Sequence, residues 1–465
     1  MKSISGRMAM IGSLICLGAE SLIAQAPDTL YPNLCPRTCN LEVHANQYVH
    51  PDTVWFWYEN GPANIGKGEL RILSGDTLGT NPQTAKAIQR ISLDNGDSIY
   101  DTIGTLVFDD ALSHDHWHFE DFVQYRLLTV VNDTAVGDSV IVSPKSGFCL
   151  VDFHDSIACG CDGLEGSKAP DRVFTTTGCL VEPPGLFMGI SVGWYDLYGF
   201  GIEGQAMNIA GVANGVYWLE STVNANGNVR ETSTANNVAM IKVNIISTKD
   251  SYEANNSKAV VDAMTRGATN SAYLAACDFP IIIDNLNIDQ ETDYYYWYPD
   301  EDWFRFRVTE PAGPSHYVKI NFDQNLGDLE LQLLNSAGDS LGVSAADVGD
   351  SEYVSLNGKA AGWYYARIFG DVKQDHGEGL LQYSINWYYR LEISAPAGVC
   401  GDVNGDGIVN AADILHFNTA CWTDSFICEN LADIDGKCPI HCYKDLVYLM
   451  SYVFESGPDP DCTCQ

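Results

Sequence analysis

The sequence predicts a mainly β protein built from several domains, and three observations support this. The chain has 465 residues, too many for one hydrophobic core, so two to four domains are expected. Hydrophobic residues make up 46% and aromatic residues 11% of the chain, which is enough for globular domains. The apolar residues fall in short alternating runs separated by Gly, Asn and Asp, a pattern typical of β-strands. We therefore expect two β-sandwich domains followed by a small α-helical calcium-loop domain.

The charge of the chain excludes one class of partner. Asp and Glu total 61 against 25 Lys and Arg, which gives a formal net charge of −36. Phosphate binding needs clustered basic side chains, so nucleic acid is excluded as a partner. An acidic surface attracts cations, such as metal ions, amines or basic proteins. Solubility alone would explain the charge equally well.

Residues 1–26 have the pattern of a signal peptide. Lys2 and Arg7 precede the apolar run "MAMIGSLICLG", and the small residues Ala24 and Ala26 offer a cleavage point. No later segment approaches the roughly 18–20 apolar residues that span a bilayer, so we expect no membrane span in the mature chain. Of the 15 cysteines, Cys16 lies in this leader, which leaves an even number. Export and paired cysteines predict disulfides and a secreted location, extracellular or at the cell surface.

Residues 27–247 form the first predicted domain. Runs such as "GELRIL", "YWLESTV" and "AMIKVNI" predict its strands, and the polar stretch "STKDSYEANNSK" marks its end. Cys149 is expected to pair within the domain, with three plausible partners: Cys159, Cys161 and Cys179.

Residues 252–395 form the second predicted domain. Its runs "DEDWFRFRV", "GDLELQLLNSAGDSL" and "GWYYARIFG" alternate with period 2, as in a β-sandwich. Together with "SYEANNS", their order resembles the bacterial pre-peptidase C-terminal domain, which implies a non-catalytic accessory module. The acidic segment "PDEDWF" is interpreted as a solvated loop, with a calcium site as the alternative.

Residues 396–465 carry a strong calcium-loop pattern, "GDVNGDGIVNAADILHF". Calcium prefers six to eight oxygen ligands around a sharply turned loop, and Gly407 stands at the turn position. A second, degenerate repeat has Lys437 at a ligand position. The pair of repeats resembles a dockerin domain, which implies a cohesin-like or cell-surface scaffold as partner. The predicted calcium ligands are Asp402, Asn404, Asp406, the Ile408 carbonyl, Asn410 and Asp413.

The segment "HDHWHFEDF" places His114, His116 and His118 in strict alternation. In a helix, residues i and i+2 point about 200° apart, so the three could not share an ion. On a strand they face the same side, although the outer Cα atoms would lie roughly 13 Å apart, so the strand must bend. Imidazole suits copper, zinc, nickel or iron, and the sequence leaves the choice between zinc and copper open.

Four separated motifs resemble the catalytic domain of the lysyl oxidase family. They are "HDHWHFEDFVQYRL", "SPKSGFCLVD", "GISVGWYDLYGFGIEGQAMNI" and "GVYWLESTVNANGNVRETSTANN", in this order over roughly residues 30–247. The animal enzymes have cysteines flanking the "YDxY" segment where this chain has Trp194 and Gly204. We interpret this as variation of a bacterial type.

The resemblance implies a site and an activity. His114, His116 and His118 would bind copper, and Lys145 and Tyr198 would be joined into lysine tyrosylquinone, a cofactor that the protein makes from itself. Primary amines, including lysine side chains of proteins, polyamines or small monoamines, would be oxidised by molecular oxygen to aldehydes, with release of hydrogen peroxide and ammonia. Asp196 is the first candidate for the catalytic base, ahead of Glu120, Asp121 and Asp152.

The residues also fit two other functions. The chain could be a non-catalytic extracellular adhesion or matrix protein that holds a structural metal and is anchored by its dockerin-like tail. It could also be a zinc hydrolase, but the sequence shows no positioned base such as the glutamate of an HExxH helix.

Overall fold

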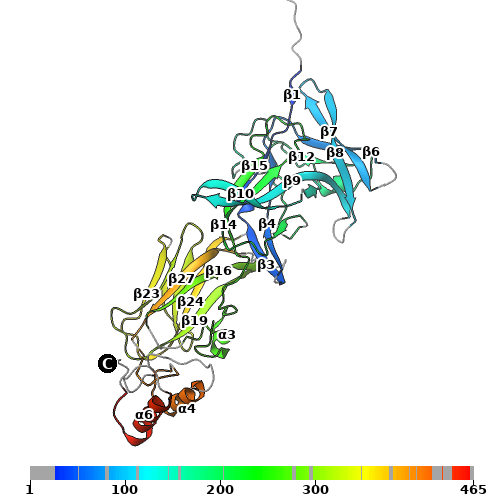
Figure 1. The fold of residues 1–465 in the computed structure, drawn as a ribbon. Helices are drawn as coiled ribbons and strands as arrows, with labels where there is room; N and C mark the ends of the chain where they lie inside the picture. Colours follow the sequence, from blue (N-terminus) through cyan, green and yellow to red (C-terminus); the bar gives the residue numbers. More distant parts are fainter. Residues whose placement is uncertain are drawn as a thin grey trace, which may run out of the picture.

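The structure is a computed structural model that describes residues 27–460, apart from residues 51, 79–82, 111–114, 145, 156–158, 200, 203, 275–278, 293–296, 347, 376–380, 397, 405, 422–431 and 433–441. The described chain is mainly β, which confirms that part of the prediction. It is elongated, with the N-terminal strands at one end and two helices at the other (Figure 1).

A ten-stranded sheet dominates the N-terminal half of the described chain. Seven strands follow the order β12-β6-β7-β8-β9-β14-β15, while β1 pairs with β7, and β10 and β11 pair with β9. Their bounds are β1 (Thr29–Leu30), β6 (Leu70–Thr77), β7 (Thr84–Leu93), β8 (Ser98–Asp109), β9 (His116–Val131), β10 (Ala135–Val142), β11 (Ser146–Phe148), β12 (Phe187–Ile190), β14 (Gly215–Val223) and β15 (Val238–Ile245).

A five-stranded sheet packs against the first and has the order β13-β4-β3-β17-β18. Phe56 and Tyr58 point from β4 into the shared core, where the Tyr58 and Tyr125 rings lie 4.6 Å apart. The bounds are β3 (His44–His50), β4 (Thr53–Tyr58), β13 (Ala206–Asn208), β17 (Gln290–Thr292) and β18 (Trp297–Pro299), and a smaller pair joins β2 (Leu34–Pro36) to β5 (Pro62–Asn64).

Two four-stranded sheets enclose a second core in the middle of the molecule (Figure 1). Alternation drives this packing, because β19 buries every second side chain from Asp302 to Val308. One sheet contains β16 (Ile281–Ile288), β27 (Asn386–Ser394), β20 (Tyr317–Phe322) and β23 (Ser351–Ser355), the other β19 (Glu301–Val308), β24 (Gly362–Gly370), β21 (Leu329–Asn335) and β22 (Ser340–Ser344), and β25 (Val372–Asp375) pairs with β26 (Leu381–Tyr383).

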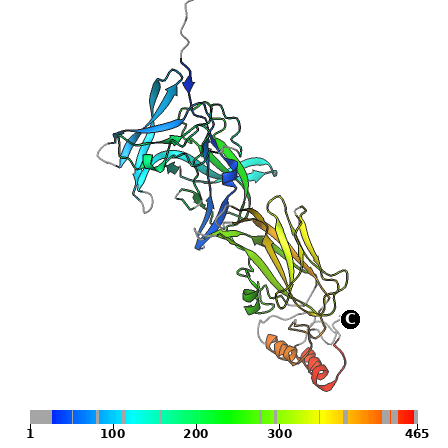
Figure 2. The ribbon, with the colours of Figure 1, turned by 180° about the vertical axis from the view of Figure 1, so that it is seen from behind.

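Helices are few in the described residues. The two longest, α4 (Ala411–Ala420) and α6 (Cys442–Glu455), lie together at the C-terminal end, as Figure 2 shows from behind. Phe417 and Leu449 are buried in the small core that these helices share. The others are α1 (Thr38–Leu41), α2 (Thr176–Cys179) and α3 (Lys258–Ala263). No helix of the described residues is long and apolar enough to cross a membrane. The signal-peptide prediction concerns residues 1–26, outside the described residues.

Three disulfides tie the first half together. Cys149 pairs with Cys179, one of its three expected partners, while Cys35 pairs with Cys161 and Cys39 with Cys159. Paired cysteines were predicted from their even number, and the structure confirms that these six are bonded.

The predicted halves of the molecule are joined by backbone pairing. β17 follows the polar boundary in the sequence, yet it pairs in parallel with β3, with Glu291 opposite Asn46. The Asp289 side chain accepts hydrogen bonds from Asn46 Nδ2 at 3.0 Å and from the Tyr48 hydroxyl at 2.7 Å. The sheet that contains β4 therefore runs from the first half into the second.

Candidate active site and metal centre

The histidine segment is a strand from His116 onward. His116 and His118 are partly exposed, while Trp117 and Phe119 between and after them are buried in the core. The alternation changes at Asp121, whose φ of 58° is left-handed, so that Phe122 and Val123 are both buried. Asp115, directly before His116, also has a left-handed φ of 37°, so the backbone departs from a regular strand on both sides of the two described histidines. His114 lies outside the described residues.

The two described histidines face each other. Their Nε2 atoms are 3.0 Å apart, and their ring centroids are 4.7 Å apart. When two nitrogens bind the same metal ion at about 2.0–2.1 Å with an N–metal–N angle of about 90°, the nitrogens are about 2.9 Å apart. The pair therefore fits a shared metal ion, and imidazole donors suit copper and zinc alike. Asp109 Oδ2 lies 3.9 Å from His118 Nδ1, on the side away from the pair.

A cavity of about 680 Å³ lies beside His118. Its walls come from four places: β4, the ends of β8 and β9, the segment around Lys145, and the segment after Tyr198. Lys145 itself lies outside the described residues, but its neighbours Pro144 and Ser146 both line this cavity. The lining residues are Trp55, Trp57, Asp109, His118, Glu120, Ser143, Pro144, Ser146, Gly147, Gly204 and Ala206.

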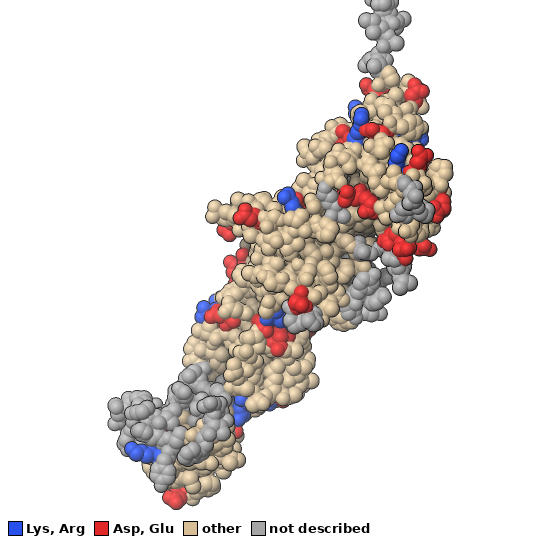
Figure 3. All heavy atoms as spheres, turned by 45° about the vertical axis from the view of Figure 1, so that its right-hand side comes forward, with Lys and Arg blue, Asp and Glu red and all other residues tan. Residues whose placement is uncertain are grey.

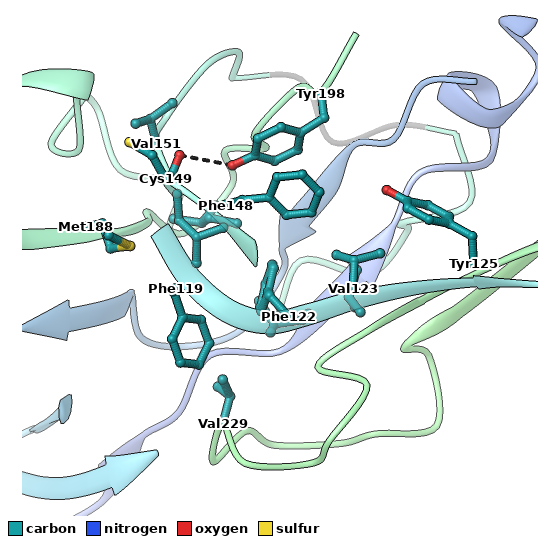
Figure 4. Close-up of a cluster of buried hydrophobic side chains, with 14 of the residues drawn as sticks. Phe119, Phe122, Val123, Tyr125, Phe148, Cys149, Val151, Met188, Tyr198 and Val229 are labelled. Carbon is teal, nitrogen blue, oxygen red and sulfur yellow. Dashed lines mark hydrogen bonds between the residues drawn. The ribbon is translucent and has the colours of Figure 1, made fainter. Parts of the chain in front are cut away.

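Tyr198 is not among the residues that line this cavity; it belongs to the hydrophobic core of the first half. Its ring packs on Phe148, with centroids 3.8 Å apart, and its hydroxyl donates to the Cys149 carbonyl oxygen at 2.9 Å (Figure 4). The hydroxyl also contacts Asp196 Oδ2. Phe148 pairs across the strands with Phe119, which follows His118 directly. Phe148 therefore connects the histidine strand to Tyr198.

Asp196 is buried beside Tyr198. Its Oδ2 also accepts a hydrogen bond from the Val151 backbone N–H at 3.0 Å. Burial raises the pKa of Asp196 to about 7, although these hydrogen bonds oppose the shift. Burial, and then the nearby Asp196 carboxyl, raise the pKa of Tyr198 well above its ordinary value. At neutral pH the pair thus combines a protonated phenol with a carboxyl that is close to its own pKa.

Two other candidates for the catalytic base, Asp152 and Glu120, lie in different surroundings. Asp152 is fully buried and accepts four hydrogen bonds, from the backbone N–H groups of Val173, Phe174 and Ser191 and from the Ser191 hydroxyl. It therefore holds loops together. Glu120 lines the cavity, and its pKa is raised by burial and by the charges of Asp121 and Asp109.

Nothing in the sequence singles out the cavity residues Trp55 and Trp57. The run "TVWFWY" predicts an alternating strand, but nothing in it indicates that its outer face would meet a histidine strand sixty residues later. Asp109 was missed for the same reason, because it belongs to the histidine site only through the pairing of β8 with β9.

The acidic segment "PDEDWF" is not a solvated loop, which corrects the sequence interpretation. Asp300 and Asp302 are 2% and 0% exposed. Carboxylate oxygens of Asp250, Glu253 and Asp302 lie within 4.8 Å of one another, and such a group could hold a hard cation. Burial raises the pKa of Glu253 to about 7.

The predicted calcium loop turns its carboxylates inward. Asp402 and Asp413 are fully buried, and Gly407 has the left-handed φ of 81° that its place in the turn requires. Burial, and then the charges of Asp402 and Asp406, raise the pKa of Asp413 to about 6. This donor set fits a cation. Asn404 Oδ1 accepts from Arg266 at 2.9 Å, Asn410 caps α4, and Ile408 is exposed. Lys437 of the second repeat lies outside the described residues, and the dockerin-like assignment stays a prediction.

The comparisons with known proteins support the assignment of the segment that contains the histidine strand. The lysyl oxidase family model matches residues 106–256, which contain the histidine strand, Lys145, Asp196 and Tyr198. This part of the chain is therefore similar to the lysyl oxidase family, the class of protein that its site indicates. No curated protein matches the chain at a significant level.

Similar solved structures are remote. They include the infectious bursal disease virus VP2 subviral particle, at 9% identity over 82% of this chain and 75% of that chain, with a TM-score of 0.15. Another is the exo-beta-1,3-galactanase from Phanerochaete chrysosporium, at 9% identity over 73% and 78% of the two chains, with a TM-score of 0.14. Likenesses at this level carry no argument about fold or function.

Proposed function

We propose that the chain is a secreted amine oxidase of the lysyl oxidase type, which uses molecular oxygen and water to convert primary amines to aldehydes and releases hydrogen peroxide and ammonia. The observation that carries the proposal is the family match over residues 106–256, within which His116 and His118 face each other beside a cavity flanked by both neighbours of Lys145. Copper would be held by His114, His116 and His118.

The cofactor would be lysine tyrosylquinone, formed from Lys145 and Tyr198, and it would supply an electrophilic carbonyl for the substrate amine. The surrounding residues have defined tasks. Asp196 Oδ2 accepts the Tyr198 hydroxyl and can hold its proton, because its pKa is close to neutrality. Phe148 covers one face of the Tyr198 ring and excludes water from it.

The proposal is tested with full-length protein loaded with copper in air. We expect hydrogen peroxide release from primary amines, and a coloured adduct with phenylhydrazine. Both should be absent from Tyr198→Phe, which retains the ring that packs on Phe148 but lacks the hydroxyl, and from metal-free protein. An active Tyr198→Phe variant would contradict the assignment.

One observation favours a second candidate, a non-catalytic metal-binding adhesion or matrix protein. The Tyr198 hydroxyl is buried and already bonded to both the Cys149 carbonyl and Asp196, as a purely structural tyrosine would be. This alternative predicts copper or zinc binding with no phenylhydrazine adduct. Calcium in the loop at 402–413 and a scaffold partner for the C-terminal region are proposed under either function.

A further inference from the structure

Two tryptophans form one wall of the cavity beside His118. Trp55 and Trp57 alternate along β4 with the buried Val54 and Phe56, so both indoles lie on the outer face of the strand. Their ring centroids are 6.5 Å apart, and both side chains are half-buried. Trp57 is held in place by a hydrogen bond from Nε1 to Gln47 Oε1 at 3.0 Å. The cavity thus has a broad aromatic surface with a fixed orientation.

Two carboxylates belong to the same cavity. Asp109 ends β8, and Glu120 lies on β9 two residues after His118. Asp121 directly follows Glu120 and adds a third carboxylate close to the cavity. These like charges repel one another, and a bound cation would relieve the repulsion. Figure 3 shows further acidic side chains on the surface of the N-terminal half of the molecule.

Aromatic faces and carboxylates together recognise organic cations. An ammonium group over the face of an indole is attracted by the negative charge of the ring face, by roughly 0.5–2 kcal/mol according to how far it is desolvated. A volume of about 680 Å³ is within the range of small-ligand sites and exceeds what a single ammonium group fills. The cavity therefore suits a cation on an alkyl chain of several carbons.

We propose that this cavity is a recognition site for diamines and polyamines, in which Trp55 and Trp57 hold the distal ammonium group with Asp109 and Glu120. The reacting amine would then be directed toward the segment that flanks Lys145. This orientation rests on the proposed function, whereas the binding of the cation does not. Both tryptophans lie on β4, outside the segment 106–256 that matches the family model.

Binding is tested first with a dication that cannot be oxidised, pentane-1,5-bis(trimethylammonium), by calorimetry on metal-free full-length protein. We expect saturable binding at one site, weakened by salt. Trp55→Leu and Trp57→Leu should each weaken it about tenfold, which corresponds to about 1.4 kcal/mol. Trp55→Phe, which keeps an aromatic face, should lose less. Trp218→Leu, on β14 and outside the cavity lining, is the matched control and should bind as the unaltered protein does.

Turnover supplies the second readout. For copper-loaded protein, kcat/KM for pentane-1,5-diamine should exceed that for pentylamine, and Trp55→Leu should abolish the preference. If the dication binds as predicted but no amine is oxidised, the oxidase proposal fails and the recognition site stands. If amines are oxidised without preference, and the tryptophan variants bind the dication as well as the unaltered protein does, the recognition site is refuted.

Discussion

The contact between Asp196 and Tyr198 is the residue-scale feature on which the chemistry depends. A carboxyl with a pKa of about 7 accepts the hydroxyl of a phenol whose own pKa burial has raised. The phenol cannot lose its proton to solvent, because its ring is buried against Phe148. Of the two acceptors of this hydroxyl, the Cys149 carbonyl and Asp196, Asp196 is the one that can take up the proton, and it can do so only when it is ionised.

We therefore expect the formation of the quinone from Tyr198 to depend on pH. After copper and oxygen are added, the rate at which the visible band appears should rise as pH increases through about 7, because Asp196 loses its proton there. Asp196→Asn should slow the reaction about a hundredfold and remove this limb. Stopped-flow absorbance over a pH series measures both effects.

Asp155→Asn is the control for this prediction. Asp155 is an exposed carboxylate that pairs with Lys168, so its loss should leave the pH profile unchanged. An Asp196→Asn protein with the rate and pH profile of the unaltered chain would show that the proton is accepted elsewhere.

At the scale of elements, the bend of β9 and the short β11 bring the parts of the site together. β11 pairs with β9 across the irregularity at Asp121, so that Phe148 lies opposite Phe119. The Cys149–Cys179 disulfide follows directly and anchors β11 to α2. Because the Cys149 carbonyl accepts the Tyr198 hydroxyl, this disulfide also positions the tyrosine.

Replacing Cys149 and Cys179 by alanine should both destabilise the fold and loosen Tyr198. Removing a cross-link over a separation of 30 residues costs about 3–4 kcal/mol of unfolding free energy by the chain-entropy argument. Denaturant unfolding would measure this loss, and tyrosine hydrogen exchange would report on the Tyr198 hydroxyl.

The Cys39–Cys159 bridge provides the comparison. Its removal should destabilise the protein through a longer separation of 120 residues, yet leave the exchange of the Tyr198 hydroxyl unchanged. Equal exchange in both alanine pairs would contradict the positioning role of Cys149–Cys179.

Individual strands and turns could be predicted from the sequence more fully than the contacts between them. Alternation is a local signal, so the strand at His116–His118 and the mainly β character could be inferred directly. The turn at Gly407 followed in the same way from its place in the loop pattern. The approach of Trp55 to Glu120 depends on how two sheets pack, and the burial of Asp302 depends on the sandwich around it. No local pattern encodes such contacts.

At the scale of the whole molecule, the two halves meet through buried carboxyls. Asp289 bonds to Asn46 and Tyr48 across the junction, and burial raises its pKa to about 6. Burial also raises the pKa of Glu253 to about 7. Since the folded state holds these protons more tightly than the unfolded chain, their contribution to stability is complete at low pH and is lost as pH rises through these values.

With a chelator present, we expect the midpoint of thermal unfolding to fall between pH 5 and pH 8 because these carboxyls must ionise in a buried site. Replacing Glu253 and Asp289 by Gln and Asn should reduce the fall, since amides do not titrate. Glu310→Gln, a change at a carboxylate outside the junction, serves as the control. A double variant that loses as much stability over this range as the unaltered protein would refute this role for the junction.

The most direct measurement is mass spectrometry of proteolytic fragments from the copper-loaded protein after exposure to air. We expect one fragment in which Lys145 and Tyr198 are covalently joined, and we expect it to be missing from Tyr198→Phe and from protein kept without copper. Recovery of Lys145 and Tyr198 only in separate, unmodified peptides from the copper-loaded protein in air would contradict the assignment of this chain as a quinone-dependent amine oxidase.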